Sequence, residues 1–99
     1  MNHKVYFDGS VQSIWFRVSD GNASVGVIAP GSYSFSTDGA EQVIVLTGEL
    51  EVKLPGKEWR TVQAPGAYVV PPQSQFEVRA GGDVSYLCRF DPPNRTLER

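Results

Sequence analysis

The chain has 99 residues with 11 acidic and 9 basic side chains, and its net charge of −2 fits one soluble domain without a basic surface for nucleic acid. No apolar run reaches the roughly 18 residues that a membrane span needs, and Met1–Lys4 lacks the apolar core of a secretory signal. One cysteine cannot form an intramolecular disulfide, so we expect a cytoplasmic protein with no nucleic-acid or membrane partner.

Glycine and proline turn signals divide the chain into short segments in which apolar and polar residues alternate. Such segments are typical of antiparallel strands. They predict strands over residues 5–7, 11–18, 24–29, 32–36, 42–47, 49–54, 58–63, 67–70, 75–79 and 84–90. No segment has helical periodicity. We therefore expect an all-β, single-domain barrel or jelly roll over residues 1–91 and a C-terminal tail over residues 92–99.

Three details of the strands predict local structure. Gly26 lies inside a strand, which indicates a close approach of backbone or side chain. In the last strand, alternation places Tyr86 and Cys88 on one face and Arg89 on the other, and we expect Cys88 to be a small buried apolar residue. Trp15 and Leu87 are expected at exposed positions, where they would fit a homodimer interface.

The sequence does not predict a metal site. A zinc, iron or manganese site in a β-barrel usually needs two or three imidazoles. The only histidine is His3, in an N-terminus that we expect to be mobile.

The chain resembles small single-domain cupins, a family of jelly-roll proteins. Two loose motifs carry the resemblance, Gly31…Glu41…Gly48 and Gly66…Pro71-Pro72…Ser74. The metal-binding histidines of the family would fall near residues 34–37 and 76–77, and none of these is histidine. Among the usual ligands only Glu41 remains, so the resemblance implies a cupin fold without the usual metal.

A narrower resemblance covers residues 6–90. The phrases that carry it are Ala23-Ser24-Val25-Gly26-Val27, Pro30-Gly31-Ser32-Tyr33-Ser34-Phe35, Ser36-Thr37, Gly48-Glu49-Leu50-Glu51-Val52-Lys53-Leu54-Pro55-Gly56, Glu58-Trp59 and Ser85-Tyr86-Leu87-Cys88. In this order and spacing they are similar to the pyrimidine/purine nucleoside phosphorylase family of small cupins. The resemblance implies a metal-independent pentosyltransferase that converts purine and pyrimidine nucleosides plus phosphate to free base and α-D-ribose 1-phosphate. Phosphate would be its co-substrate, with no other cofactor.

The chemistry of phosphorolysis suggests two catalytic candidates. Glu41 would hold the ribose hydroxyls, because a carboxylate accepts two hydrogen bonds; its alternative is an exposed turn carboxylate. Tyr86 would stack on the base and donate a phenolic hydrogen bond. Tyr33 has the same inward pattern and is a substrate-binding candidate. For both tyrosines the alternative is plain core packing.

Phosphate needs cationic or hydroxyl donors. Arg89 and Arg17 are the candidates, since each lies within a predicted strand; the alternative for each is an exposed strand arginine. Thr37 could bind ligand or phosphate, or it could cap local backbone. Gln75 flanks the second motif and would reach the interior of the barrel, unless it lies on the surface.

Two other functions remain open at this point. The first is a non-catalytic, metal-free cupin that binds a small sugar- or nucleotide-like ligand, which fits the lack of a recognisable acid/base pair. The second is a structural barrel that dimerises. A homodimer is compatible with all three readings, and the family resemblance favours the enzyme.

Overall fold

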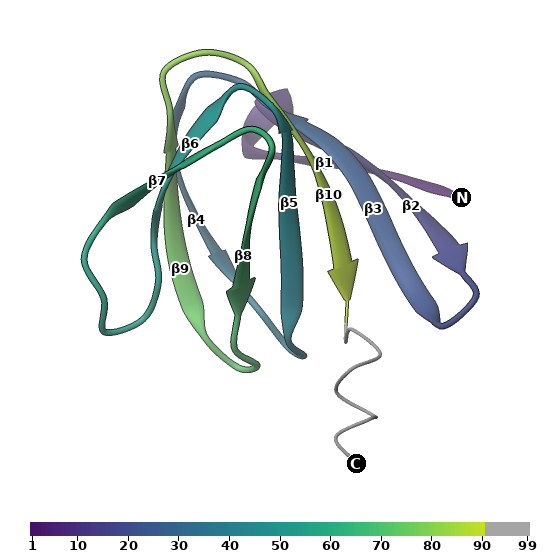
Figure 1. Ribbon diagram of the computed structural model, residues 1–99. Coiled ribbons are helices and arrows are strands. Elements are labelled where there is room, and N and C mark those ends of the chain that lie inside the picture. The colour runs from purple at the N-terminus through teal and green to yellow at the C-terminus, as the bar shows by residue number, and fades with distance from the viewer. Residues whose placement is uncertain (91–99) are drawn as a thin grey trace.

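The computed structural model describes residues 1–90 as ten strands and one 3-10 turn (Figure 1). The strands are β1 (Asn2–Tyr6), β2 (Val11–Val18), β3 (Gly21–Ile28), β4 (Gly31–Ser36), β5 (Glu41–Thr47), β6 (Glu49–Lys53), β7 (Arg60–Gln63), β8 (Gly66–Val70), β9 (Gln75–Ala80) and β10 (Val84–Phe90), with η1 at Phe7–Gly9. The all-β prediction is confirmed. The tail predicted over residues 92–99 lies outside the described residues.

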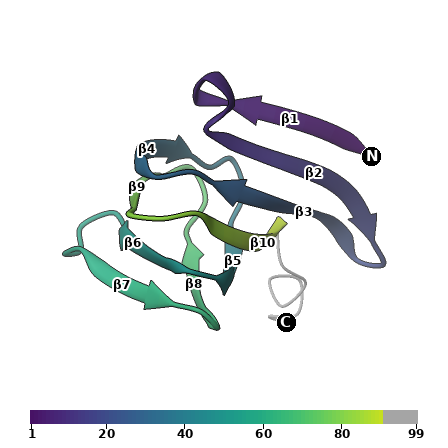
Figure 2. The ribbon, with the colours of Figure 1, turned by 90° about the horizontal axis from the view of Figure 1, so that it is seen from above.

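The strands form two antiparallel sheets that face each other (Figure 2). One sheet has six strands in the order β1-β2-β3-β10-β5-β8, and the other has four in the order β4-β9-β6-β7. Within the described residues, no strand of one sheet pairs with a strand of the other. The fold is therefore a two-sheet cupin-like jelly roll and not a single closed barrel. Apolar residues at alternate positions of both sheets fill the space between them, including Val45, Leu50, Val52 and Val78, each nearly or fully buried.

The N-terminus differs from the sequence prediction. Strand β1 begins at Asn2 rather than at residue 5, and it pairs with β2 through Lys4↔Ser13 and its neighbours. The eight-residue β2 is long enough to pair with all five residues of β1. His3 is therefore part of the sheet, and its Nε2 lies 3.0 Å from Oε1 of Gln12. A short edge strand carries little apolar pattern, which is why sequence reasoning assigned these residues to a mobile end.

The turn η1 connects β1 to β2 at the edge of the six-stranded sheet, and its Phe7 packs against the four-stranded sheet. Phe7 has a left-handed backbone with φ of 52°, which ends β1 and turns the chain. The ring of Phe7 lies 5.0 Å from the Tyr33 ring and 5.5 Å from the Phe35 ring, both on β4. These aromatic contacts bring the edge of the six-stranded sheet against the edge of the four-stranded sheet. No helix within residues 1–90 is long and apolar enough to cross a membrane.

Candidate active site

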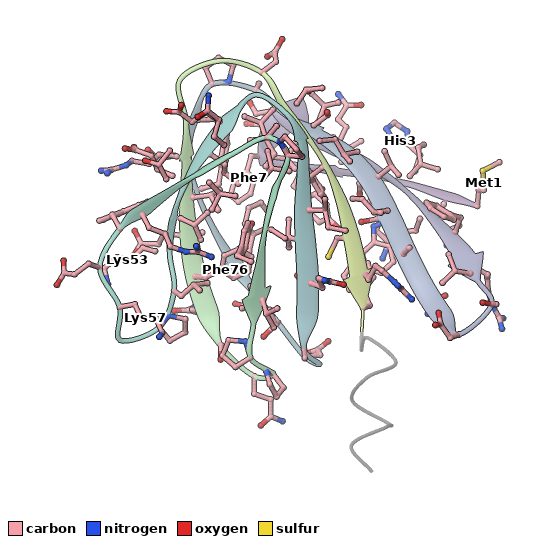
Figure 3. All side chains as sticks on the ribbon, in the orientation of Figure 1. Met1, His3, Phe7, Lys53, Lys57 and Phe76 are labelled. Atoms are coloured by element: carbon pink, nitrogen blue, oxygen red, sulfur yellow. The ribbon has the colours of Figure 1, made fainter. Side chains whose placement is uncertain are left out.

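A cavity of about 650 Å³ lies between the two sheets. Figure 3 shows Phe76, one of its lining residues, in the space between the sheets, while Lys53 and Lys57 lie at the periphery. The polar and aromatic groups that line the cavity come mainly from the inner face of the six-stranded sheet. They are Lys4, Ser13, Trp15, Ser24, Glu41, Tyr68, Tyr86, Cys88 and Phe90, with Tyr6, Phe7, Ser34, Phe35, Ser36, Asp38 and Phe76 at other points.

The register of the six-stranded sheet arranges these groups in three rows. The first row is Lys4–Ser13–Gly26–Tyr86–Val45, the second is Trp15–Ser24–Cys88–Val43–Tyr68, and the third is Phe90–Glu41–Val70. Residues directly opposite on antiparallel strands have neighbouring side chains on the same face. Groups far apart in the sequence therefore meet in one cavity.

Glu41 is the first residue of β5 and is partly buried at the cavity wall. The thiol of Cys88, on the neighbouring strand β10, donates to Oε1 of Glu41 over 3.6 Å. Burial raises the pKa of the Glu41 carboxyl, the Cys88 hydrogen bond opposes this rise, and the nearby Asp38 adds to it. The site thus contains a carboxylate that is partly removed from water and can accept hydrogen bonds from a ligand.

Tyr86 lies across the backbone of β3 at Gly26. A methyl group at Gly26 would be 2.6 Å from the Tyr86 hydroxyl oxygen and 2.7 Å from the carbonyl oxygen of Gln12, which confirms the predicted close approach. Burial is the main cause that raises the pKa of Tyr86 to about 12, partly opposed by a hydrogen bond with Ser13. Its phenol is therefore protonated at neutral pH and can act as a donor.

Tyr68 and Cys88 complete the interior part of the cavity. Tyr68 on β8 is buried, lies opposite Val43, and was not predicted from the sequence. Burial raises the pKa of Tyr68. Burial, followed by the charge of Glu41, raises the pKa of the Cys88 thiol. Cys88 is buried as predicted, and its thiol stays protonated, so it serves as a donor to Glu41 and not as a nucleophile.

Trp15 belongs to the cavity and not to an exposed interface position. Its ring stacks on Phe90 with centroids 4.1 Å apart and planes at 15°, and its Nε1 donates to the hydroxyl of Ser13 over 3.1 Å. The ammonium of Lys4 lies 3.7 Å from the centroid of the Trp15 ring. The prediction for Trp15 was wrong because alternation alone does not say which face of β2 meets the interior.

Two of the predicted substrate-binding residues have their hydroxyls engaged by backbone. Tyr33 is buried outside the cavity lining and donates to the carbonyl oxygens of Ala29 (2.8 Å) and Pro30 (3.1 Å). Thr37 is buried and donates to the carbonyl oxygen of Pro71 over 2.8 Å, while it accepts from the backbone N–H of Ser74 at 3.0 Å. These positions match the alternatives of core packing and backbone capping.

The other three predicted binding residues also lie outside the cavity lining. Gln75 is exposed on β9, and Arg17 is exposed on β2. Arg89 faces away from Tyr86, as alternation predicted, and its Nη2 donates to Oδ1 of Asp20 over 2.8 Å. Of the seven predicted residues, the structure brings Glu41 and Tyr86 together in one cavity.

The residues present do not fit the metal that many cupins carry. Within residues 1–90, no three or more histidine, cysteine, aspartate or glutamate side chains are grouped to hold an ion. His3 contacts Gln12, and Glu41 has Cys88 as its hydrogen-bond partner. No step of the reaction is therefore assigned to a metal.

The fold and cavity define the protein as a small cupin-type jelly roll. A cupin superfamily protein from Desulfitobacterium hafniense has a similar structure, with a TM-score of 0.67 over 89% of this chain and 80% of that chain, at 16% identity. A Vibrio parahaemolyticus protein of unknown function is closer, with a TM-score of 0.85 over 88% of this chain and 94% of that chain, at 35% identity.

Sequence comparison narrows this class to one family. The family model described as pyrimidine/purine nucleoside phosphorylase matches residues 1–90. A pyrimidine/purine nucleoside phosphorylase from Tolumonas auensis is 44% identical over 86 residues, which cover 86% of this chain and 92% of that protein. The chain belongs to the pyrimidine/purine nucleoside phosphorylase family.

Proposed function

We propose that this protein is a nucleoside phosphorylase, a pentosyltransferase that converts purine and pyrimidine nucleosides plus phosphate to free base and α-D-ribose 1-phosphate. The observation that carries the proposal is the family match over residues 1–90. A cavity in which a desolvated carboxylate and a phenol donor line the same wall supports it. Family membership disfavours the alternative of a cupin that binds a ligand without turnover.

The reaction replaces one bond at the anomeric carbon of the sugar. An oxygen of phosphate bonds to C1′ as the bond between C1′ and the base nitrogen breaks, and the electron pair of that bond goes to the base. The base gains a proton, which overall comes from hydrogen phosphate. By analogy with glycoside cleavage, positive charge develops on the sugar in the transition state.

Glu41 suits the sugar part of this reaction. A carboxylate accepts hydrogen bonds from two neighbouring hydroxyls, and its negative charge stabilises the positive charge that develops at C1′. Because Glu41 is partly removed from water, these interactions are stronger than they would be on the surface. We therefore assign the ribose hydroxyls to Glu41.

Tyr86 suits the leaving base. A phenol with a pKa of about 12 stays neutral at working pH and donates a hydrogen bond to the base as it departs with its electron pair. Aromatic side chains around the cavity, including Phe35 and Phe90, offer flat surfaces that accept any base. Since strong discrimination between bases requires hydrogen bonds to their edges, stacking supports activity on both purines and pyrimidines.

The proposed reaction uses phosphate as its co-substrate and no metal or other cofactor. The side chains that could hold a metal support this, because the Cys88 thiol donates a hydrogen bond to the Glu41 carboxylate. We also propose that the protein works in the cytoplasm, which the free thiol of Cys88 supports, since thiols stay reduced in that compartment.

We propose that the protein is a homodimer in which a second copy covers the outer face of the six-stranded sheet. Ile14, Val25, Leu87 and Ile44 stand side by side across β2, β3, β10 and β5 on this face. Ile14 and Val25 are 41% and 40% exposed. Leu87 and Ile44 are half-buried, so Leu87 is less exposed than the sequence predicted. A partly exposed apolar surface of this kind favours association, and two copies of one patch meet by a two-fold axis.

The test of the proposed function is release of free base from uridine, inosine and adenosine. The assay is run with phosphate, without phosphate, and with phosphate plus a chelator. We expect release that requires phosphate and continues with the chelator. Release without phosphate would identify a hydrolase, and no release from any nucleoside would overturn the enzyme.

A further inference from the structure

The residues that line the cavity include one cationic side chain, Lys4. A phosphate dianion that is removed from water needs a positive partner, so this side chain is notable in a cavity that also contains Glu41 and Asp38. The strand pattern pointed to Arg89 and Arg17 for phosphate and gave no sign of Lys4.

The structure holds the Lys4 ammonium in a defined place. Lys4 is directly opposite Ser13 across β1 and β2, and its Nζ lies 3.7 Å from the centroid of the Trp15 ring. Trp15 is itself fixed by its bond to the Ser13 hydroxyl and by its stack on Phe90. Because Lys4 and Phe90 cannot share one face of the ring, they lie on opposite faces and the indole is clamped between them.

Three arginines that could bind phosphate are engaged or positioned elsewhere. Arg89 is paired with Asp20 at 2.8 Å on the outer face, and Arg17 is exposed outside the cavity lining. Arg79 pairs with Glu51 at 3.0 Å and lies over the Trp59 ring, away from the cavity lining.

We propose that Lys4, together with the hydroxyl of Ser13 beside it, binds the inorganic phosphate that attacks the sugar. This inference rests on the proposed phosphorolysis. The ammonium supplies charge, and the Ser13 hydroxyl, which accepts from Trp15, can turn its one hydrogen from Tyr86 to a phosphate oxygen.

The placement also separates the charges of the site. Lys4 is on β1 and Glu41 is on β5, with β2, β3 and β10 between them in the sheet. Phosphate at Lys4 and the sugar hydroxyls at Glu41 would therefore be held by groups from different strands of the cavity wall, which lets the ammonium offset the repulsion between phosphate and the carboxylates.

The experiment compares Lys4→Met, which keeps a stem of similar length over Trp15 and removes the charge, with Lys4→Arg, which keeps it. Lys53→Gln is the control, because Lys53 bonds to the carbonyl oxygen of Lys57 at the periphery. Loss of one charge-assisted hydrogen bond predicts a rise of about 10- to 100-fold in the KM for phosphate in Lys4→Met. The KM for the nucleoside should stay within about threefold, Lys4→Arg should recover most of the loss, and Lys53→Gln should match wild type.

A binding measurement separates this inference from the proposed function. Titration calorimetry with inorganic phosphate should detect binding to wild type and a loss of about 10-fold or more in affinity in Lys4→Met, whether or not base is released. An unchanged KM and affinity for phosphate in Lys4→Met would overturn the inference, even if wild type is a phosphorylase. An equal loss for nucleoside and phosphate would also overturn it, since that pattern indicates a merely structural role. Phosphate-independent base release would instead refute the proposed function.

Discussion

Glu41 and Cys88 are diagonal neighbours on the paired strands β5 and β10, with the thiol of Cys88 donating to Oε1 of the Glu41 carboxylate over 3.6 Å. They are 47 residues apart in the sequence. The bond gives the chain's single cysteine a role in setting the charge state of the carboxylate that we assign to the sugar.

Replacing Glu41 by glutamine should reduce activity and increase stability. The variant loses the charge that strengthens two hydrogen bonds, and each charged bond accounts for about a 10-fold effect, so kcat/KM should fall by about 100-fold.

Because burial raises the pKa of Glu41 in the folded state, ionisation costs folding free energy, and this cost increases as pH rises through the raised pKa. Thermal unfolding at pH 5 and pH 8 should show a larger gain for Glu41→Gln at pH 8. The exposed Glu49→Gln is the control; a gain that is equal at both pH values would contradict the account.

Removing the thiol of Cys88 should move the acidic limb of the pH profile of kcat/KM to higher pH. The Cys88 bond lowers the pKa of Glu41, so its loss in Cys88→Ala should raise that pKa further. Since the site needs the ionised carboxylate, kcat/KM should begin to fall at a higher pH as the solution is acidified. Cys88→Ser keeps a donor and should stay near the wild-type profile. Identical limbs in all three proteins would mean that the thiol does not act on Glu41.

Replacing Tyr86 by phenylalanine should slow the departure of the base. Loss of a positioned donor lowers kcat by about 100-fold or more for inosine. The base of 7-methylinosine leaves without needing a proton, so the variant should keep most of its activity on that nucleoside. Steady-state rates on the two substrates measure the difference, and an equal loss on both would remove Tyr86 from this role.

Replacing Gly26 by alanine should displace Tyr86, because the added methyl would lie 2.6 Å from its hydroxyl and 2.7 Å from the carbonyl oxygen of Gln12. Overpacking of this kind costs about 1 to 3 kcal/mol of stability. Chemical denaturation gives the stability of Gly26→Ala, with Gly82→Ala as control, since a methyl at Gly82 meets nothing within 4 Å. The kcat loss from Gly26→Ala should add little to that of Tyr86→Phe in the double variant. If the two kcat losses add fully in the double variant, Gly26 does not act through Tyr86.

A lysine at Val25 should prevent dimerisation without unfolding the chain. Val25 is 40% exposed at the centre of the apolar row on the outer face, so a lysine there remains solvated in the single copy but is buried in a dimer. Light scattering after size-exclusion chromatography should give a dimer for wild type and a monomer for Val25→Lys. Thr61→Lys, on the exposed part of β7, should remain dimeric. A wild-type monomer at micromolar concentration would refute the interface.

Local pattern predicted the parts of the fold and site that depend on neighbouring residues. Alternation correctly placed Tyr86 and Arg89 on opposite faces of β10, and the glycine in β3 correctly indicated a close approach. Glu41 was found through the family motif. Each of these predictions depends only on the residues of one strand or one turn.

The missed parts depend on pairing between distant strands. Strand β10 lies between β3 and β5, so the row that joins Trp15, Cys88 and Tyr68 cannot be derived from any single segment. Lys4 was missed because β1 is a short edge strand whose place depends on β2. Thr37 has a hydroxyl that fits a ligand as well as backbone, and only the approach of Pro71 and Ser74 distinguishes the two.

The most direct test of the central claim is identification of both products from uridine and phosphate. Uracil is measured by chromatography and the sugar product by phosphorus NMR, for wild type and for Glu41→Gln. The account predicts equal amounts of uracil and ribose 1-phosphate from wild type, and a rate about 100-fold lower from a folded Glu41→Gln. Uracil accompanied by free ribose, or an undiminished rate in Glu41→Gln, would contradict it.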